Sequence, residues 1–295
     1  MAGMAFRLAR LGEAGNERPY ALLDGAAFAL DSLTADIDGA FLDADGVERA
    51  RDAVESGRIA SSGGLEALDL RAGPPITGVG KVVCIGLNYR DHAAETGAAL
   101  PTEPVIFLKD PSTIVGPNDD VRIPRKSVKT DWEVELAVVI GKTARYLDDE
   151  ASALACVAGY AIANDVSERE FQLERGGQWD KGKCCETFNP LGPCLVSASD
   201  VADPQSLALQ LWVNGELKQD GNTRDMVFGV GEIVRYVSQF MVLRPGDVIN
   251  TGTPAGVALG QPEPKPYLRA DDVMELAIEG PTEGFGRQRQ RLVEA

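Results

Sequence analysis

The chain has 295 residues, of which 44% are hydrophobic and 25% are charged, a composition typical of a globular protein with one large domain or two unequal ones. Its 45 acidic residues outnumber its 29 basic residues and give a net charge of −16. This charge disfavours nucleic acid and anionic membranes as partners, so an anionic substrate would need a local positive site made by a metal, Arg or Lys.

The apolar residues form no run long enough to span a membrane, and the first ten residues lack the apolar core of a signal peptide. We therefore expect neither a membrane segment nor a secreted protein. The five cysteines form no C-x-x-C pair, and an odd number without such spacing favours free thiols in a reducing cytoplasm. They are Cys84, Cys156, Cys184, Cys185 and Cys194.

Residues 1–75 are the first predicted unit, a small N-terminal module without a convincing chemical motif. Two short strands are expected on either side of a turn at Asp24 and Gly25. A short helix is expected to begin near Gly46 and to end at Gly57. Residues 76–295 are the second predicted unit, the main domain.

Strand patterns dominate the main domain. They cover residues 82–86, 104–109, 131–141, 157–163 and 207–213, and the last run meets a hairpin turn at Asn214 and Gly215. Residues 229–241 predict a helix whose apolar face is formed by Val230, Ile233, Val234, Val237, Phe240 and Met241. Many strands, few helices and no regular βαβ alternation predict a mixed α/β fold that is predominantly β.

The segment 131–141 carries the strongest chemical pattern. As a strand it places alternate apolar residues on one face and Asp131, Glu133 and Glu135 on the other. Carboxylates so placed repel one another, and either solvent or a hard cation must offset the repulsion. The acidic face then becomes apolar, which favours the rim of a pocket over a wet surface. Asp165 follows the next strand, and such an all-oxygen set suits Mg²⁺, Mn²⁺ or Ca²⁺ rather than zinc.

Three further segments carry candidate site residues. His92, the only histidine, shares a helical face with Glu95 at i and i+3, either as a general base held by a carboxylate or as an exposed surface pair. Lys183 lies in a Gly- and Lys-rich stretch. This stretch is either a mobile surface loop or a loop that brings Lys183 to an anion. Thr253 lies in a glycine-rich turn without the lysine of a P-loop, and its hydroxyl could bind a carboxylate.

Together these segments resemble the fumarylacetoacetate hydrolase family over about residues 80–280. The resemblance rests on residues 86–95, 131–141 and 163–172, on 182–183 with 187–193, on 213–216 with 221–224, and on 245–249 with 251–257. It implies a mixed β-roll catalytic domain that is usually dimeric and binds a divalent metal. A small N-terminal module is common in bacterial members of this family.

The resemblance also implies roles for individual residues. Glu133, Glu135 and Asp165 would bind the metal, with Mg²⁺ favoured over Mn²⁺ or Ca²⁺. His92 and Glu95 would activate a water, and Lys183 would face the developing enolate. The substrate-binding residues would be Tyr89, Arg169, Gln172 and Thr253. Two positions depart from the family pattern: Cys184 and Cys185 follow the lysine where Ser and an apolar residue are usual, and Trp132 stands where Tyr is often found.

The resemblance favours a metal-dependent hydrolase that cleaves a 2,4-diketo acid to pyruvate and a carboxylic acid. An acylpyruvate or a 2,4-diketo-3-deoxy sugar acid, such as a deoxyrhamnonate or deoxyfuconate derivative, is the preferred substrate. The alternatives are an isomerase of the hydroxymuconate type and an oxaloacetate decarboxylase, which need the same enolate but no water. A non-catalytic acid- or metal-binding protein is a third hypothesis. The presence of both the His92–Glu95 pair and Lys183 disfavours it.

Overall fold

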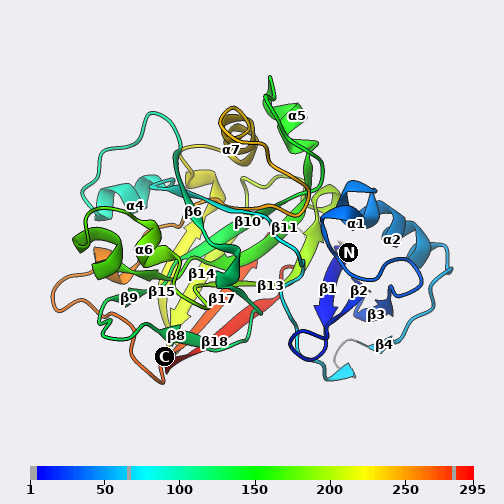
Figure 1. The fold of residues 1–295 in the computed structure, drawn as a ribbon, viewed down its shortest axis with the longest axis horizontal. Helices are drawn as coiled ribbons and strands as arrows, with labels where there is room; N and C mark the ends of the chain where they lie inside the picture. Colours follow the sequence, from blue (N-terminus) through cyan, green and yellow to red (C-terminus); the bar gives the residue numbers. More distant parts are fainter. Residues whose placement is uncertain (1–4, 65–67, 281–283) are drawn as a thin grey trace.

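The computed structural model describes residues 5–64, 68–280 and 284–295, and two β-sheets packed face to face form its centre (Figure 1). The order of strands in the large sheet is β4-β3-β2-β1-β13-β11-β10-β16-β5-β6, with β7 paired to β13. These strands are β1 (Arg7–Leu11), β2 (Arg18–Leu23), β3 (Ala26–Ala29), β4 (Gly63–Gly64), β5 (Val82–Gly86), β6 (Val105–Lys109), β7 (Ile114–Val115), β10 (Val134–Ile140), β11 (Val157–Asn164), β13 (Asn189–Ser197) and β16 (Val248–Asn250).

The smaller sheet has the order β15-β14-β17-β18-β8. Its strands are β8 (Val121–Ile123), β14 (Ala208–Val213), β15 (Glu216–Asn222), β17 (Val273–Glu279) and β18 (Arg287–Glu294), and a separate pair joins β9 (Thr130–Asp131) to β12 (Ser167–Glu168). Most neighbours are antiparallel, whereas β5 with β16, β7 with β13 and β8 with β18 are parallel. The predicted fold class, mixed α/β and predominantly β, is therefore confirmed.

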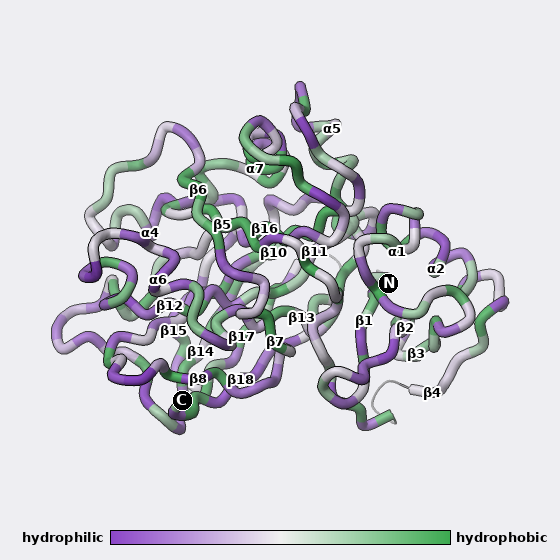
Figure 2. Tube along the Cα trace, viewed as in Figure 1, coloured by the Kyte–Doolittle hydropathy of each residue, from purple (hydrophilic) through white to green (hydrophobic). Residues whose placement is uncertain are grey.

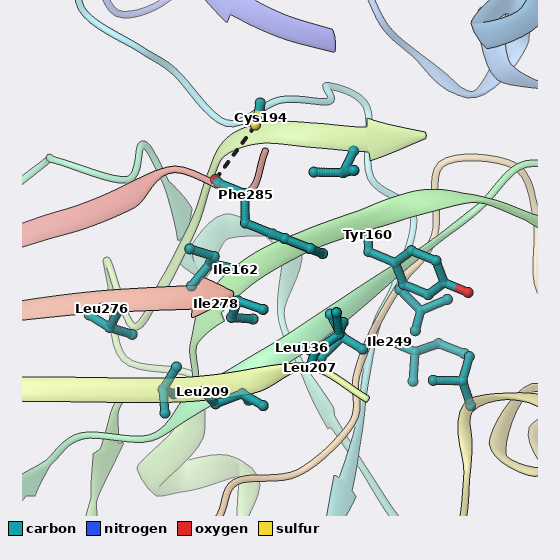
Figure 3. Packing of buried hydrophobic residues seen from close by; sticks show 14 of the residues in the cluster. Leu136, Tyr160, Ile162, Cys194, Leu207, Leu209, Ile249, Leu276, Ile278 and Phe285 are labelled. Atoms are coloured by element: carbon teal, nitrogen blue, oxygen red, sulfur yellow. Dashed lines mark hydrogen bonds between the residues drawn. The ribbon is translucent and has the colours of Figure 1, made fainter. Parts of the chain in front are cut away.

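The main core lies between the two sheets. Figure 3 shows Leu136, Ile162 and Ile249 of the large sheet facing side chains of β14 and β17. The facing residues are Leu209, Leu276 and Ile278, and all six are buried. The other side of β10 is also covered, so the central strands are apolar along both faces, as the hydropathy of the chain trace shows (Figure 2). Burial on both faces holds this strand rigidly at the centre of the domain.

The N-terminal strands extend the large sheet, because β1 pairs antiparallel with β13. The predicted turn between β2 and β3 is confirmed, and both Asp24 and Gly25 have positive φ, as a tight hairpin turn requires. The helices are short and lie around the sheets (Figure 1). They are α1 (Gly39–Asp43), α2 (Gly46–Glu55), α4 (Arg90–Glu95), α5 (Glu150–Leu154), α6 (Asp180–Lys183) and α7 (Val230–Val237).

Helix α7 is shorter than its sequence pattern predicts. Val230, Ile233, Val234 and Val237 are buried as expected, but the helix ends at Val237. The chain then turns away, so Phe240 is 64% exposed and its predicted place on the buried face was wrong. In the described part of the chain, no helix has the length and apolar character needed to cross a bilayer.

Candidate active site

Most of the predicted site residues line one pocket of about 250 Å³. The lining includes His92 of α4, Lys183 of α6, Glu135 of β10, and Gly252 and Thr253 of the loop that follows β16. Its polar and charged side chains include His92, Glu133, Glu135, Arg169, Gln172, Lys183 and Thr253. The fold thus brings together groups that are as far apart in sequence as His92 and Thr253.

Three carboxylates meet next to this pocket because two neighbouring strands bring them together, and two of them, Glu133 and Glu135, line it. Glu133 immediately precedes β10, Glu135 is the second residue of β10, and Asp165 directly follows the antiparallel neighbour β11. The backbone N–H of Asp165 donates to the carbonyl oxygen of Glu133 at 2.9 Å, which fixes the two residues side by side. One oxygen from each of the three carboxylates lies within 4.8 Å of the other two.

Lys183 bridges two members of this acidic triad. Its Nζ donates to Glu133 Oε2 at 2.7 Å and to Asp165 Oδ2 at 2.9 Å. Burial alone would raise the pKa of Glu133, but the charges of Lys183 and Arg169 lower that pKa to about 2. Burial likewise works against the lysine charge, yet Asp165 and Glu133 outweigh it and hold the pKa of Lys183 above its ordinary value. Both groups are therefore charged at neutral pH.

Glu135 differs from the other two acids because it forms no ion pair with any residue in the described ranges. Its one hydrogen bond to the protein is the backbone N–H of Gly252, which donates to Oε2 at 2.7 Å. Burial, together with the charges of Asp165 and Glu133, raises the pKa of Glu135 well above its ordinary value. A negative charge at this position therefore needs a cation that the described side chains do not supply.

Asp131 does not join the triad, although the alternation predicted it on the same face. The predicted single strand is interrupted after β9, so the alternation does not continue through Trp132 into β10. Asp131 instead accepts a hydrogen bond from Arg169 Nε at 2.8 Å, and its two oxygens also accept from the backbone N–H groups of Ala258 and Leu259. This carboxylate positions Arg169 and anchors the turn at residues 258–260.

Arg169 and Gln172 lie together at one side of the pocket. Arg169 Nη1 donates to Gln172 Oε1 at 3.0 Å, and Arg169 Nη2 lies 2.7 Å from Glu133 Oε1. The amide nitrogen of Gln172 is left as a donor toward the pocket. Thr253 is less free, because its hydroxyl donates to the Val134 carbonyl at 2.9 Å and accepts from Gln219 at 2.8 Å.

His92 and Glu95 form a hydrogen-bonded pair on α4. His92 Nδ1 lies 2.8 Å from Glu95 Oε1, and since a carboxylate only accepts, Nδ1 carries the proton. The other oxygen of Glu95 accepts from the backbone N–H of Gly256 at 3.0 Å. The helix with its histidine is thus tied to the loop after β16, which also binds Glu135 through Gly252.

The structure places Tyr89 outside the pocket lining. Its side chain is fully buried in the main core, and its hydroxyl has no hydrogen-bond partner among the described residues. Burial raises the pKa of Tyr89 well above its ordinary value, so the hydroxyl is neutral. Tyr89 immediately precedes α4, and its side chain packs in the main core and not in the pocket lining.

Comparison with known proteins agrees with this arrangement. Residues 81–293 match the sequence profile of the fumarylacetoacetate (FAA) hydrolase C-terminal domain. The chain belongs to the fumarylacetoacetate hydrolase family. A protein of Burkholderia multivorans that carries only a general hydrolase name is 57% identical over 210 residues, which are 71% of this chain and 74% of that protein.

Two solved structures of the fumarylacetoacetate hydrolase family illustrate the range of its reactions. The fumarylacetoacetate hydrolase of the psychrophile Exiguobacterium antarcticum is 33% identical, with a TM-score of 0.78 over 98% of this chain and 100% of its own. The 2-hydroxyhepta-2,4-diene-1,7-dioate isomerase of Mycobacterium marinum is also 33% identical, with a TM-score of 0.74 over 98% of both chains. Members of this family are enzymes that act as hydrolases or as isomerases.

A divalent cation, which enzymes of the fumarylacetoacetate hydrolase family often use, fits the acidic triad. Glu133, Glu135 and Asp165 offer only oxygen ligands, which suits Mg²⁺, Mn²⁺ or Ca²⁺. The structural observation that supports this fit is that the carboxyl group of Glu135 is buried beside two other acids and forms no ion pair within the described ranges. A cation next to Glu135 would offset the repulsion that raises its pKa.

Lys109 is a site residue that the sequence analysis missed. Its side chain is fully buried, and its Nζ donates to Asp165 Oδ1 and, at 3.0 Å, to the carbonyl oxygen of Val166. The two oxygens of Asp165 are thus held by two different lysines, Lys109 and Lys183. The sequence feature that could have pointed to Lys109 is its position as a charged residue at the end of the apolar run that forms β6.

Proposed function

We propose that this chain is a metal-dependent hydrolase that cleaves the C3–C4 bond of a 2,4-diketo acid. One water is consumed, and the products are pyruvate and the carboxylic acid that corresponds to the acyl group. The observation that carries the proposal is His92, which is hydrogen-bonded to Glu95 and lines the same pocket as Glu133, Glu135 and Lys183. Hydrolysis needs a base of this kind to activate the water, whereas decarboxylation needs only an electron sink.

His92 is the base in this proposal. Because Nδ1 donates to Glu95, Nε2 of the neutral imidazole has a lone pair that can accept a proton from water. The hydroxide so formed attacks the C4 carbonyl, and Glu95 stabilises the resulting imidazolium. The hydrogen bond from Gly256 keeps Glu95 in place during this step.

Lys183 acts after the water has been added. As the C3–C4 bond breaks, its electron pair passes to C3 and is delocalised onto the C2 oxygen as the pyruvate enolate. The Lys183 ammonium stabilises this negative charge, and the imidazolium of His92 returns the proton to C3 to give the methyl group of pyruvate. A divalent cation held by Glu133, Glu135 and Asp165 supplies Lewis-acid stabilisation of the same charge when bound.

Arg169 and Gln172 bind the acid end of the substrate in this proposal. Arg169 is oriented by Asp131 and Gln172, so its position is fixed before a substrate arrives. Isomerisation and decarboxylation remain the alternatives, since both use the enolate chemistry of Lys183 and the triad. Neither reaction requires a water activated by His92, and this residue therefore favours hydrolysis.

A product assay tests the proposal. The purified protein is incubated with Mg²⁺ and acylpyruvates, and pyruvate and the released carboxylic acid are both quantified, with a chelator-treated sample as the control. We expect equal amounts of the two products in the presence of metal and neither product after chelation. A product that is isomeric with the substrate, or CO₂ without a new carboxylic acid, would overturn hydrolysis.

A further inference from the structure

The lining of the pocket has two chemically different parts. The charged groups gather around the triad, whereas the remaining lining is largely apolar. Its apolar side chains include Leu87, Ala98, Phe107, Leu173, Trp179 and Leu259. A substrate whose acid end lies near Arg169 and Lys183 must therefore extend its other end along this apolar side.

Phe107 and Trp179 form an aromatic wall of the pocket next to Lys183. The Nζ of Lys183 lies 5.1 Å from the centre of the Phe107 ring, and this ring lies 5.4 Å from the Trp179 ring in an edge-to-face arrangement. The wall continues against Gly86, where a Cβ atom would lie 2.6 Å from Trp179 Cζ3. The absence of a side chain at Gly86 thus makes room for the indole ring.

Thr96 is a polar residue of the pocket lining, but its hydroxyl proton is already used in hydrogen bonds within its own helix. The hydroxyl of Thr96 donates to the carbonyl oxygens of His92 and Ala93 within its own helix, at 2.9 Å and 3.3 Å. Its proton is therefore used within α4, and Leu173 and Leu259, which also line the pocket, offer no polar atom in their side chains.

The positively charged side chains of the pocket lie next to the buried carboxylates, where the acid end of the substrate is placed. Apart from His92, the basic residues that line the pocket are Arg169 and Lys183, and each faces buried carboxylates. Arg175 and Lys181 lie on the neighbouring segment but do not line the pocket; Arg175 pairs with Glu170, and Lys181 donates to a backbone carbonyl. A second carboxylate on the substrate would therefore lose water without gaining a cation.

We propose that the substrate is an acylpyruvate whose acyl group is aliphatic or aromatic, and neither a dicarboxylate nor a polyhydroxylated sugar acid. This inference rests on the proposed function, because it assumes that the diketo acid end lies at the triad. It chooses between the two substrate classes that the sequence left open, and it distinguishes this chain from the isomerase whose name specifies a dioate.

Matched substrate pairs test this specificity. Crotonylpyruvate and fumarylpyruvate have the same carbon skeleton and differ only in a terminal methyl or carboxylate group. We expect kcat/KM for crotonylpyruvate to be higher by about 100-fold, because the carboxylate would be buried without a partner. In a second pair, 2,4-dioxohexanoate should be preferred over its 5,6-dihydroxy derivative by about 10-fold or more. Equal rates within both pairs, or a preference for the polar member of either, would overturn the inference.

A binding measurement separates this inference from the proposed function. The acids 2-oxoheptanoate and 2-oxoheptanedioate lack the 4-keto group, so they bind without being cleaved, and calorimetry gives their dissociation constants directly. We expect tighter binding of the monoacid whether or not the enzyme hydrolyses any diketo acid. Absence of hydrolysis with a retained monoacid preference would reject only the proposed function, whereas tighter binding of the diacid would reject the apolar acyl site.

Leu173 offers a reciprocal test with a matched control. Leu173 lines the pocket and is 45% exposed, so Leu173→Arg places a guanidinium at the apolar side with little disturbance of the core. We expect the ratio of kcat/KM for fumarylpyruvate over crotonylpyruvate to rise by about 10-fold, because the added cation can pair with the terminal carboxylate. Leu217 on β15 is also 45% exposed but lies outside the pocket lining, and Leu217→Arg should leave the ratio unchanged. An equal change in both variants would contradict the assignment.

Discussion

Gly260 lies directly against the carboxylate of Glu95: a Cβ atom at position 260 would lie 2.4 Å from Glu95 Oε2 and 2.5 Å from its Cδ. The glycine has no unusual backbone angle, so its small size is the feature that matters here. The turn that contains Gly260 is anchored by Asp131, and the same carboxylate of Glu95 is held by Gly256. The hydrogen-bonded pair His92–Glu95 therefore depends on the space left by the loop that contains Gly256 and Gly260.

Gly260→Ala should displace Glu95 from His92 without removing either catalytic group. We expect kcat to fall by about 10- to 100-fold, a part of the contribution of general base catalysis. Metal affinity should not change, because the triad lies on other elements. Steady-state kinetics and metal titration measure the two effects. Gly64→Ala is the control, since the nearest atom to its added Cβ is 3.9 Å away and activity should be unchanged.

His92→Ala should reduce hydrolysis of an acylpyruvate by about 10²–10⁴-fold. Metal-assisted decarboxylation of oxaloacetate, if the protein supports it, should be largely spared, because that reaction needs an electron sink and no activated water. Parallel assays of pyruvate formation from both substrates make the comparison. Equal loss of both activities would show that the histidine mainly positions α4.

Glu135→Gln should stabilise the metal-free protein. The amide can still accept the hydrogen bond from Gly252, but it removes the carboxylate that is repelled by Asp165 and Glu133. Thermal unfolding should show a higher midpoint for the metal-free variant, by about 2–4 °C for each 1 kcal/mol gained. Mg²⁺ should raise the midpoint of the wild type and have little effect on the variant. A midpoint that Mg²⁺ raises equally in both proteins would contradict the assignment of this ligand.

The pH dependence of stability follows from the same two glutamates. The pKa of Glu135 is raised above 4.5 in the folded metal-free protein, so the free energy of unfolding should decrease as pH rises from about 4.5 toward that raised value. The pKa of Glu133 is lowered to about 2, so its stabilisation is present above 4.5 and is lost as pH falls toward 2. The free energies of unfolding of wild type and Glu135→Gln, measured by denaturant titration across this range, should differ most at its high-pH end.

Lys183→Met should lower kcat more than it raises KM, because charge develops on the C2 oxygen only as the bond breaks. The rival explanation is that Lys183 merely attracts an anion to a protein of net charge −16. That explanation predicts a raised KM, nearly normal kcat and an effect that fades with salt. Kinetics at low and high ionic strength with saturating Mg²⁺ distinguish the two.

The parts of the site that the sequence predicted depend on local geometry. The i, i+3 spacing of His92 and Glu95 predicts that they share one helical turn, and the i, i+2 spacing of Glu133 and Glu135 predicts that these two acids lie close together. The parts it missed depend on contacts between distant segments. Lys109 reaches Asp165 across 56 residues, and Gly256 reaches Glu95 across 161. Strand alternation also failed for Asp131, because a break between two strands is not visible as a change of composition.

The source of the new oxygen atom tests hydrolysis most directly. Wild-type protein, Mg²⁺ and crotonylpyruvate are combined in water enriched in oxygen-18, and the products are analysed by mass spectrometry and NMR. We expect one labelled oxygen in each released crotonate and one pyruvate for each crotonate. Pyruvate formed without crotonate, crotonate without the label, or an isomer of the intact substrate would contradict attack of a His92-activated water at C4.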